Sequence, residues 1–434
     1  MKRPPPKVAA EAEARRLHDD TTRVANWKRW GPYLSERQWG TVREDYSADG
    51  NAWAYFPFDH SHLRAYRWGE DGLLGWCDRQ ARLCLSVALW NGRDPILKER
   101  LFGLAGPEGN HGEDCKELYF FLDSAPTHSF TRMAYVYPQA EFPYAQLREQ
   151  NARRSRLEPE FELEDTGVLD EGVFDVVATY AKAAPDDTLW TVSITNLGPR
   201  RATCHLLPQA ILRNTWSWGR TGEGYGERPR VHAVDDSVVI EGGTLGRFRL
   251  FAEGADEWLF CENESNAERL WGAAGTPWSK DAFHRRVVRG EAGAVNALGE
   301  GTKGADWFRV DLAAGETRRF RLRRVPVLMA PADPFAEFDA IVAAREAENE
   351  AFHLSHTPPG LSEQETRVLR QARAGLLCSK QAYHYVVQQW LEGDPATPAP
   401  PQQRRRGRNA EWAGHLYNRD VVSMPDTWEY PWYA

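Results

Sequence analysis

The chain has 434 residues, 42% of them hydrophobic and 27% charged, which is enough apolar material for two or three domains and excludes a wholly disordered, collagenous or coiled-coil chain. The formal net charge of −8 is spread along the sequence, so neither nucleic acid nor a membrane surface is an expected partner. The 18 Trp, 15 Tyr and 18 Phe supply flat apolar faces that suit sugar rings, bases and core packing alike.

Residues 1–26 form a polar lead-in whose Ala, Glu and Arg residues predict a short helix. It contains no apolar run that could act as a signal sequence or a membrane span, so we expect a cytoplasmic protein. The six cysteines are scattered without CxxC spacing, which predicts reduced, buried thiols rather than a disulfide framework or a zinc site. We expect no cofactor.

From residue 27 to about 330 the chain alternates short apolar or period-two runs with Gly, Pro, Asn and Asp. Many short strands with hairpin-like turns over some 300 residues predict a β-sandwich, and the lack of a fixed-period repeat disfavours a propeller. We expect residues 173–180 to pair with 189–195, and residues 307–312 to turn at 314–316 into a run over 319–327. Further predicted strands lie at 83–90, 118–123, 237–241 and 248–251.

After Val327 the apolar period becomes helical. Residues 331–360 are predicted to be a linker helix, with Asp333 as N-cap and Pro334 at the first helical position. Residues 361–434 begin a further domain, in which Ser362 and Glu365 have the spacing of a capping box. Behind the box, an apolar stripe predicts one long amphipathic helix from Ser362 to Trp390, and we expect its partners to be chain that is not present here.

Three polar clusters are candidate sites. His60 and His62, together with His111 and its neighbouring carboxylates, could hold a metal, but a hydrogen-bonded surface that locks one domain to another is favoured, and no metal site is predicted. The glycine-rich residues 216–226 lack the strand-to-helix setting of a phosphate loop, so a flexible strand-connecting loop is expected. The basic run 404–408 is expected to be a solvated loop.

The aromatic segment near the C-terminus is the best candidate for ligand contact. Trp428, Tyr430 and Trp432 surround Glu429, and stacking rings with interleaved carboxylates suit a pyranose. The pattern alone gives about equal support to core aromatics of a further domain. Ser-His-Asp catalysis is not favoured, because no nucleophile elbow surrounds His128.

The sequence resembles bacterial members of glycoside hydrolase family 63, relatives of the processing α-glucosidase and similar to mannosylglycerate hydrolases. The likeness is clear from Asp45 through Ala183 and continues in order to the aromatic segment. The matching segments are Ala65-Tyr66-Arg67-Trp68-Gly69-Glu70-Asp71-Gly72, 94–104, 109–114, 126–129, 213–218, 379–381, 390–395 and Trp428-Glu429-Tyr430-Pro431-Trp432.

The resemblance implies a large β-sandwich (a supersandwich) over 27–330, linker helices, and the first helices of an incomplete (α/α)6 barrel. It also implies an inverting glycosidase acting on an α-linked oligosaccharide or small glycoside. The general acid would be an Asp in a Trp-Asp pair beyond the aromatic segment, and the base would lie farther on. We therefore expect no catalytic residue before Ala434 and an inactive 434-residue chain.

By the same resemblance, Trp428, Glu429, Tyr430 and Trp432 would bind substrate. We interpret His60, His62, Arg64 and His111 as a domain interface supporting the rim of the pocket. The alternative is a stand-alone carbohydrate-binding or interaction module without catalysis. A nucleic-acid module using residues 404–408 fits the acidic chain poorly.

Overall fold

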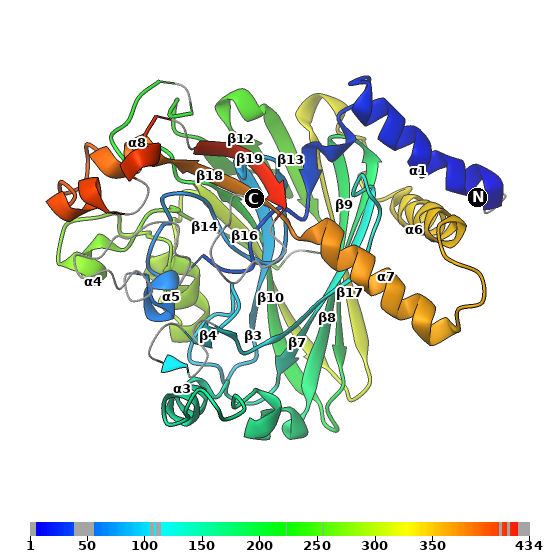
Figure 1. Ribbon diagram of the computed structural model, residues 1–434, viewed down its shortest axis with the longest axis horizontal. Helices are drawn as coiled ribbons and strands as arrows, with labels where there is room; N and C mark the ends of the chain where they lie inside the picture. Colours follow the sequence, from blue (N-terminus) through cyan, green and yellow to red (C-terminus); the bar gives the residue numbers. More distant parts are fainter. Residues whose placement is uncertain are drawn as a thin grey trace.

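A computed structural model describes residues 6–38, 56–104, 108–109, 114–222, 224–254, 256–407, 410–414 and 417–423 of the chain (Figure 1). This part is mainly β, as predicted, and two large antiparallel sheets form its body. The six-stranded sheet has the order β1 (Trp30–Gly31), β2 (Leu73–Asp78), β3 (Leu83–Trp90), β10 (Ala202–Leu212), β16 (Lys303–Leu312) and β14 (Glu257–Cys261).

The nine-stranded sheet and two small ribbons complete the β-structure of the described residues. The nine strands run β15 (Glu300–Gly301), β11 (Arg230–Val234), β12 (Ser237–Glu241), β13 (Arg247–Ala252), β17 (Thr317–Pro326), β9 (Asp187–Asn196), β8 (Val173–Ala184), β7 (Phe130–Pro138) and β6 (Leu118–Ser124). The ribbons pair β4 (Gly103–Leu104) with β5 (Asp114–Cys115) and β18 (Lys380–Val386) with β19 (Tyr417–Ser423).

The helices lie outside the sheets (Figure 1). Three of them, α1, α6 and α7, lie on one side of the nine-stranded sheet, where α6 contacts β8 and α7 contacts β6. None of the helices in the described ranges combines the length and apolar character needed to cross a bilayer. Their bounds are α1 (Pro6–Thr21), α2 (Phe58–Ser61), α3 (Tyr144–Ala152), α4 (Ala267–Trp271), α5 (Ala282–Arg289), α6 (Phe338–Ser355), α7 (Glu363–Cys378) and α8 (Val387–Glu392).

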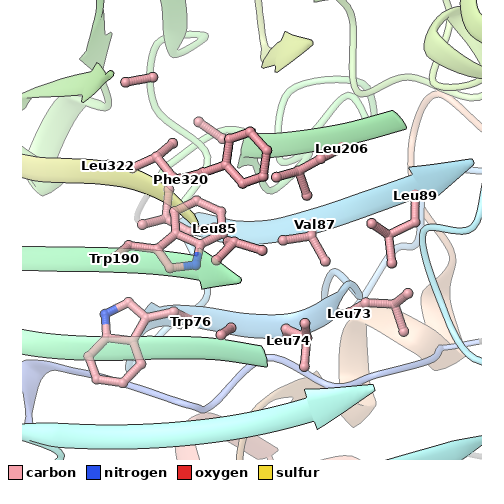
Figure 2. Packing of buried hydrophobic residues seen from close by; sticks show 14 of the residues in the cluster. Leu73, Leu74, Trp76, Leu85, Val87, Leu89, Trp190, Leu206, Phe320 and Leu322 are labelled. Carbon is pink, nitrogen blue, oxygen red and sulfur yellow. The ribbon is translucent and has the colours of Figure 1, made fainter. Parts of the chain in front are cut away.

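The main core lies between the two sheets, as the predicted sandwich requires. Trp76 of β2 stacks on Tyr180 of β8 with ring centroids 4.6 Å apart, and Trp190 of β9 follows at 5.4 Å from Tyr180. Figure 2 shows leucine and valine side chains of β3 in the same layer as Phe320 and Leu322 of β17. Aromatic stacking across the layer adds to the free energy of apolar burial and fixes how the sheets face each other.

Strand β3 is apolar on both faces because both faces are covered. Leu85 and Val87 point into the main core, whereas Ala88 packs under α5 and Cys84 lies in an outer cluster next to the β18–β19 ribbon. The continuous run over 83–90 therefore indicates a strand buried on two sides.

The predicted pairing of 173–180 with 189–195 is confirmed, with Tyr180 opposite Trp190. The run over 307–327 is not a hairpin, because β16 and β17 belong to opposite sheets. The connection between them is held by Asn196, whose side chain donates to the Leu312 carbonyl at 2.9 Å. Because β10 and β14 already occupy the two edges of β16, the chain must cross to the other sheet.

The lead-in does form a helix, α1, which packs on α6. Its Glu13 is fully buried and accepts hydrogen bonds from the Thr127 main chain at 2.8 Å, the Thr127 hydroxyl at 2.6 Å and the Ser129 hydroxyl at 2.7 Å. Arg16, one turn later, ion-pairs with Glu13 at 3.1 Å and with Glu348 of α6. The turn at 127–129 is thus where α1 attaches to the sandwich.

The linker helix starts later than predicted. The Asp333 carboxylate accepts the Phe335 main-chain N–H at 2.9 Å and closes a turn, and α6 begins only at Phe338. An Asp side chain that bonds two residues ahead competes with helix formation, so Asp333 makes a turn instead of an N-cap.

The single long helix predicted over Ser362–Trp390 is wrong. The capping box is present, with Glu365 N–H donating to the Ser362 hydroxyl at 3.2 Å and Ser362 N–H donating to the Glu365 carboxylate at 2.8 Å, but α7 ends at Cys378. Residues 380–386 form β18, in which Tyr383 and Tyr385 are buried and their neighbours are partly exposed. This period-two alternation, with Gln381, Tyr383 and Tyr385 on the buried face, prevails because β19 is available as a partner strand.

Candidate functional site

Three segments far apart in the sequence converge on the side chain of Arg67. Arg67 Nε donates to Asp394 Oδ2 at 2.6 Å, and Nη2 donates to Asp394 Oδ1 at 3.1 Å and to the Tyr225 hydroxyl at 2.9 Å. The guanidinium also lies over the rings of Trp68 and Trp218, at 4.3 and 5.5 Å from their centroids. Ion pairing and ring contacts with residues of three segments therefore hold the Arg67 side chain in place.

The Arg67 guanidinium remains positively charged although it is buried. Burial lowers the pKa of Arg67, but the hydrogen bond to Asp394 and its negative charge outweigh burial, so the net shift is upward. A buried cation of this kind persists because its partner is buried with it.

Asp394 also fixes the glycine-rich loop. Arg220 Nε donates to Asp394 Oδ1 at 2.5 Å, and Arg220 Nη2 donates to the Gly393 carbonyl at 2.6 Å. Near the start of the loop, Trp216 Nε1 donates to a Glu264 carboxylate oxygen at 2.6 Å. The segment does connect strands β10 and β11, as predicted, and these contacts anchor its first part, residues 216–220. The flexibility of the loop stays a prediction.

Arg67, Arg220 and Asp394 were not selected from the sequence. A signal was available, because Arg67 and Asp394 lie within the motif segments 65–72 and 390–395. The contact itself joins residues 327 positions apart and has no local signature. We refer to Arg67, Trp68, Trp218, Arg220 and Asp394 as the Arg67 cluster.

Of the predicted rim residues, His60, His62 and Arg64 lie in and just after α2. His60 is exposed at the end of α2, and burial together with the charge of Arg64 lowers its pKa. His62 faces His284 of α5, with ring centroids 5.4 Å apart. Burial, and then the proximity of His284 and Arg100, lowers the pKa of His62 to about 4, so the ring is neutral near pH 7.

Arg64 spans two aromatic rings. Its guanidinium is 5.2 Å from the Phe56 ring centroid and 6.0 Å from that of Trp271, which is 59% exposed. His111 lies outside the described residues. Among the residues that the structure does describe, no group of three or more His, Cys, Asp and Glu side chains gathers in a way that could hold a metal ion.

Buried ion pairs hold Glu70 and Asp71, which follow Arg67 and Trp68 in the chain. Burial alone would raise the pKa of Glu70, but Lys280 and the Asn263 amide, which donate to it at 2.7 and 2.5 Å, lower it. None of these ion pairs was predicted from the sequence, although the charged triplet 98–100 inside an apolar stretch is a usable signal. The pairs are Glu70 with Lys280, Asp71 with Arg100, and Glu99 with Lys303.

Three further carboxyl groups have raised pKa values because they are buried. Burial raises the pKa of Glu36 to about 7 and that of Asp94 to about 6. Asp94 is enclosed by the hydroxyls of Tyr137 and Tyr144, each 3.1 Å from a carboxylate oxygen. Burial and the nearby charge of Asp256 raise the pKa of Asp306 to about 8. Asp94 is satisfied within the fold, which indicates a structural role.

The predicted substrate-binding residues Trp428, Glu429, Tyr430 and Trp432 lie outside the described residues. The chain reaches them from β19, whose Asp420 ion-pairs with Arg79 of the β2–β3 turn at 2.7 Å. Through β18, the same ribbon packs beside Trp68, which meets Tyr385 edge to face at 5.2 Å. The start of β19 lies at the Trp68 end of the ribbon, and its last described residue, Ser423, pairs with Lys380 at the other end.

No known family model matches the sequence. A curated relative from Saccharomyces cerevisiae, "Uncharacterized protein YMR196W", is 38% identical over 474 residues, an alignment that covers 98% of this chain and 43% of the relative. The chain thus spans less than half of that relative's length.

Two solved structures resemble the chain weakly. "Putative kojibiose phosphorylase from human microbiome" has 6% identity and a TM-score of 0.29, covering 71% of this chain and 36% of its own. An aldose 1-epimerase of Escherichia coli K12, also titled "Putative", has 12% identity and a TM-score of 0.20, covering 45% of this chain and 64% of its own. Both titles name sugar chemistry, but TM-scores this low carry no argument about the present chain.

Proposed function

We propose that the chain is the N-terminal part of a carbohydrate-active enzyme, an inverting glycosidase that cleaves α-glycosidic bonds. Its substrate would be an α-linked oligosaccharide or a small glycoside. The sandwich would occupy residues 27–330, the linker helix 331–360, and the start of the catalytic (α/α)6 barrel 361–434.

The observation that carries this proposal is the convergence on Asp394. Three of the segments that carry the family resemblance, at 65–72, 213–218 and 390–395, meet in the Arg67 cluster through Arg67, Trp218 and Asp394, although more than a hundred residues separate each segment from the next. Arg67 and Trp68 are buried, so the cluster would hold these segments together. The sugar ring, whose C–H face packs on an aromatic while its hydroxyls require hydrogen bonds, would be bound by the aromatic segment 428–432.

Inversion requires two carboxyl groups about 6.5 to 9.5 Å apart, one protonating the leaving oxygen and the other activating a water molecule. We place both beyond Ala434. Trp428, Glu429, Tyr430 and Trp432 would bind the sugar, and His60, His62, Arg64 and His111 would support the rim.

The test compares the 434-residue chain with a protein that continues past Ala434, on a panel of α-linked disaccharides and glycosyl-glycerates. We expect turnover only by the longer protein, with the product released as the opposite anomer, detected by proton NMR of the first turnovers. Replacing Trp432 with Ala in the longer protein should raise KM more than it lowers kcat. Turnover by the 434-residue chain would overturn the placement of the acid and base, and sugar binding without turnover by either protein would favour a binding module.

A further inference from the structure

Two of the six cysteines face each other across neighbouring strands. Cys77 of β2 and Cys84 of β3 are direct partners in the antiparallel register, both are fully buried, and the Cys84 thiol donates to the Ala81 carbonyl at 3.4 Å. Directly opposed residues of an antiparallel pair have Cα atoms about 4.5 or 5.5 Å apart. Both separations fall within the range of about 4.4–6.8 Å that a disulfide spans, so the register of the two strands is compatible with a disulfide.

The remaining cysteines lack this arrangement. Cys204 stands opposite Val310 and Cys261 opposite Lys303 in their strand registers, and Cys115 stands opposite Gly103. Cys378 closes α7. Position, and not cysteine content, therefore distinguishes the pair of Cys77 and Cys84.

The closed structure protects both thiols. Burial raises the pKa of Cys77 and raises that of Cys84 well above its usual range, so neither is a thiolate while the strands stay packed. Ala81 in the adjoining turn has a left-handed φ of +49° that is unfavourable for a residue with a Cβ, and the Asp78 carboxylate holds this turn by accepting the Arg82 and Leu83 main-chain N–H groups at 2.7 and 3.0 Å. Opening this end of the hairpin would expose the two thiols together.

We propose that Cys77 and Cys84 form a reversible disulfide by exchange with a small-molecule disulfide such as glutathione disulfide. One cysteine thiol loses its proton, and the thiolate attacks glutathione disulfide, expelling one glutathione thiolate and leaving a mixed disulfide. The second cysteine thiolate attacks the protein sulfur of that bond and expels the second glutathione. Two protein thiols lose two electrons and two protons, and one glutathione disulfide becomes two glutathione thiols.

The disulfide would link β2 to β3, the two strands on which the β18–β19 ribbon packs. Ala382 and Val421 of the ribbon pack against the cluster that contains both cysteines, and the Ala382 N–H donates to the Tyr33 carbonyl at 2.7 Å. The inference rests on the register of β2 and β3 alone, and it stands whether or not the chain belongs to a glycosidase.

The experiment treats the folded 434-residue protein with glutathione disulfide, blocks free thiols with iodoacetamide under denaturing conditions, and digests with trypsin without reduction. Cleavage after Arg67, Arg79, Arg82 and Arg93 places the two cysteines in separate peptides, 68–79 and 83–93. We expect mass spectrometry to find these peptides joined, at the summed mass less two hydrogens, and to find them separate after treatment with dithiothreitol.

Two variants serve as controls. Cys204→Ser should keep the joined peptides, and Cys77→Ser should lose them while Cys84 is recovered as the alkylated thiol. The wild-type result stands by itself if the second variant does not fold. The proposal is overturned if glutathione modifies Cys115 while Cys77 and Cys84 stay alkylatable. It is also overturned if the joined peptides arise only from urea-unfolded protein, or if Cys84 joins another cysteine in Cys77→Ser.

Discussion

Asp306 offers the sharpest test of the energetics of the sandwich. It lies on β16 opposite Trp258 of β14, its side chain is fully buried, and neither carboxylate oxygen is hydrogen-bonded. Burial first, and the negative charge of Asp256 second, raise its pKa to about 8 from an ordinary value of 3.8. The folded protein therefore binds a proton at pH 7 that the unfolded chain has released.

Proton linkage gives the sign and the size of the effect of Asp306 on stability. Stability falls as pH rises wherever the folded state binds more protons, which for Asp306 is the interval from about pH 4 to about pH 8. Each pH unit above the pKa of the unfolded chain lowers the free energy of unfolding by about 1.4 kcal/mol, so at pH 7 the buried Asp306 lowers it by about 4 kcal/mol at most. Asp306→Asn has nearly the shape of the protonated acid and does not titrate, so it should raise the free energy of unfolding by up to that amount.

The assay is urea unfolding of both proteins between pH 4.5 and 8.5. We expect the two unfolding free energies to diverge with increasing pH and to run parallel above about pH 8, where folded Asp306 is ionised too. The pH slope is decisive, because a poorly bonded amide would add only a constant offset. Asp311→Asn is the matched control, since Asp311 lies on the same strand but is exposed and pairs with Arg201, so a change under about 0.5 kcal/mol is expected. A difference between Asp306→Asn and wild type that does not vary with pH would refute the reasoning.

Three other substitutions probe the site and its supports. His62, with a pKa of about 4, binds a proton less readily in the folded state, so stability should fall by about 3 kcal/mol at most between pH 6.5 and 4, and His62→Phe should flatten the Tm profile over that range. Asp394→Ala leaves Arg67 buried without its carboxylate and should cost about 3–5 kcal/mol in urea unfolding, and a loss below 1 kcal/mol would contradict the assigned ion pair. Glu13→Ala should release α1 and speed amide exchange and proteolysis within residues 6–21, whereas exposed Glu11→Ala should change neither.

Local pattern predicted much of the fold because much of it is locally encoded. The apolar run over 83–90, the pairing of Tyr180 with Trp190 and the capping box at Ser362 each depend on neighbouring residues or a short turn. The predicted helix through Tyr383 was wrong because the apolar stripe fits both a helical and a strand period. Pairing with β19, more than thirty residues later in the chain, stabilises the strand β18 instead.

The candidate site was less predictable for a related reason. The sequence pattern placed His60, His62 and Arg64 together, since they share one short segment, and the structure describes all three. Arg67 and Asp394 are 327 residues apart in the sequence, and no periodicity, cap or turn signal indicates that they are in contact.

The β18–β19 ribbon has a consequence for how the protein is made. It covers the outer cluster on β2 and β3, and the ion pair that closes it joins Arg79 to Asp420, 341 residues later. At about 5–20 residues per second, roughly 20–70 seconds of synthesis separate the two partners. Until the ribbon is synthesised, the strands that carry Cys77 and Cys84 lack the cover of Ala382 and Val421, so we expect the nascent sandwich to expose apolar surface that chaperones bind.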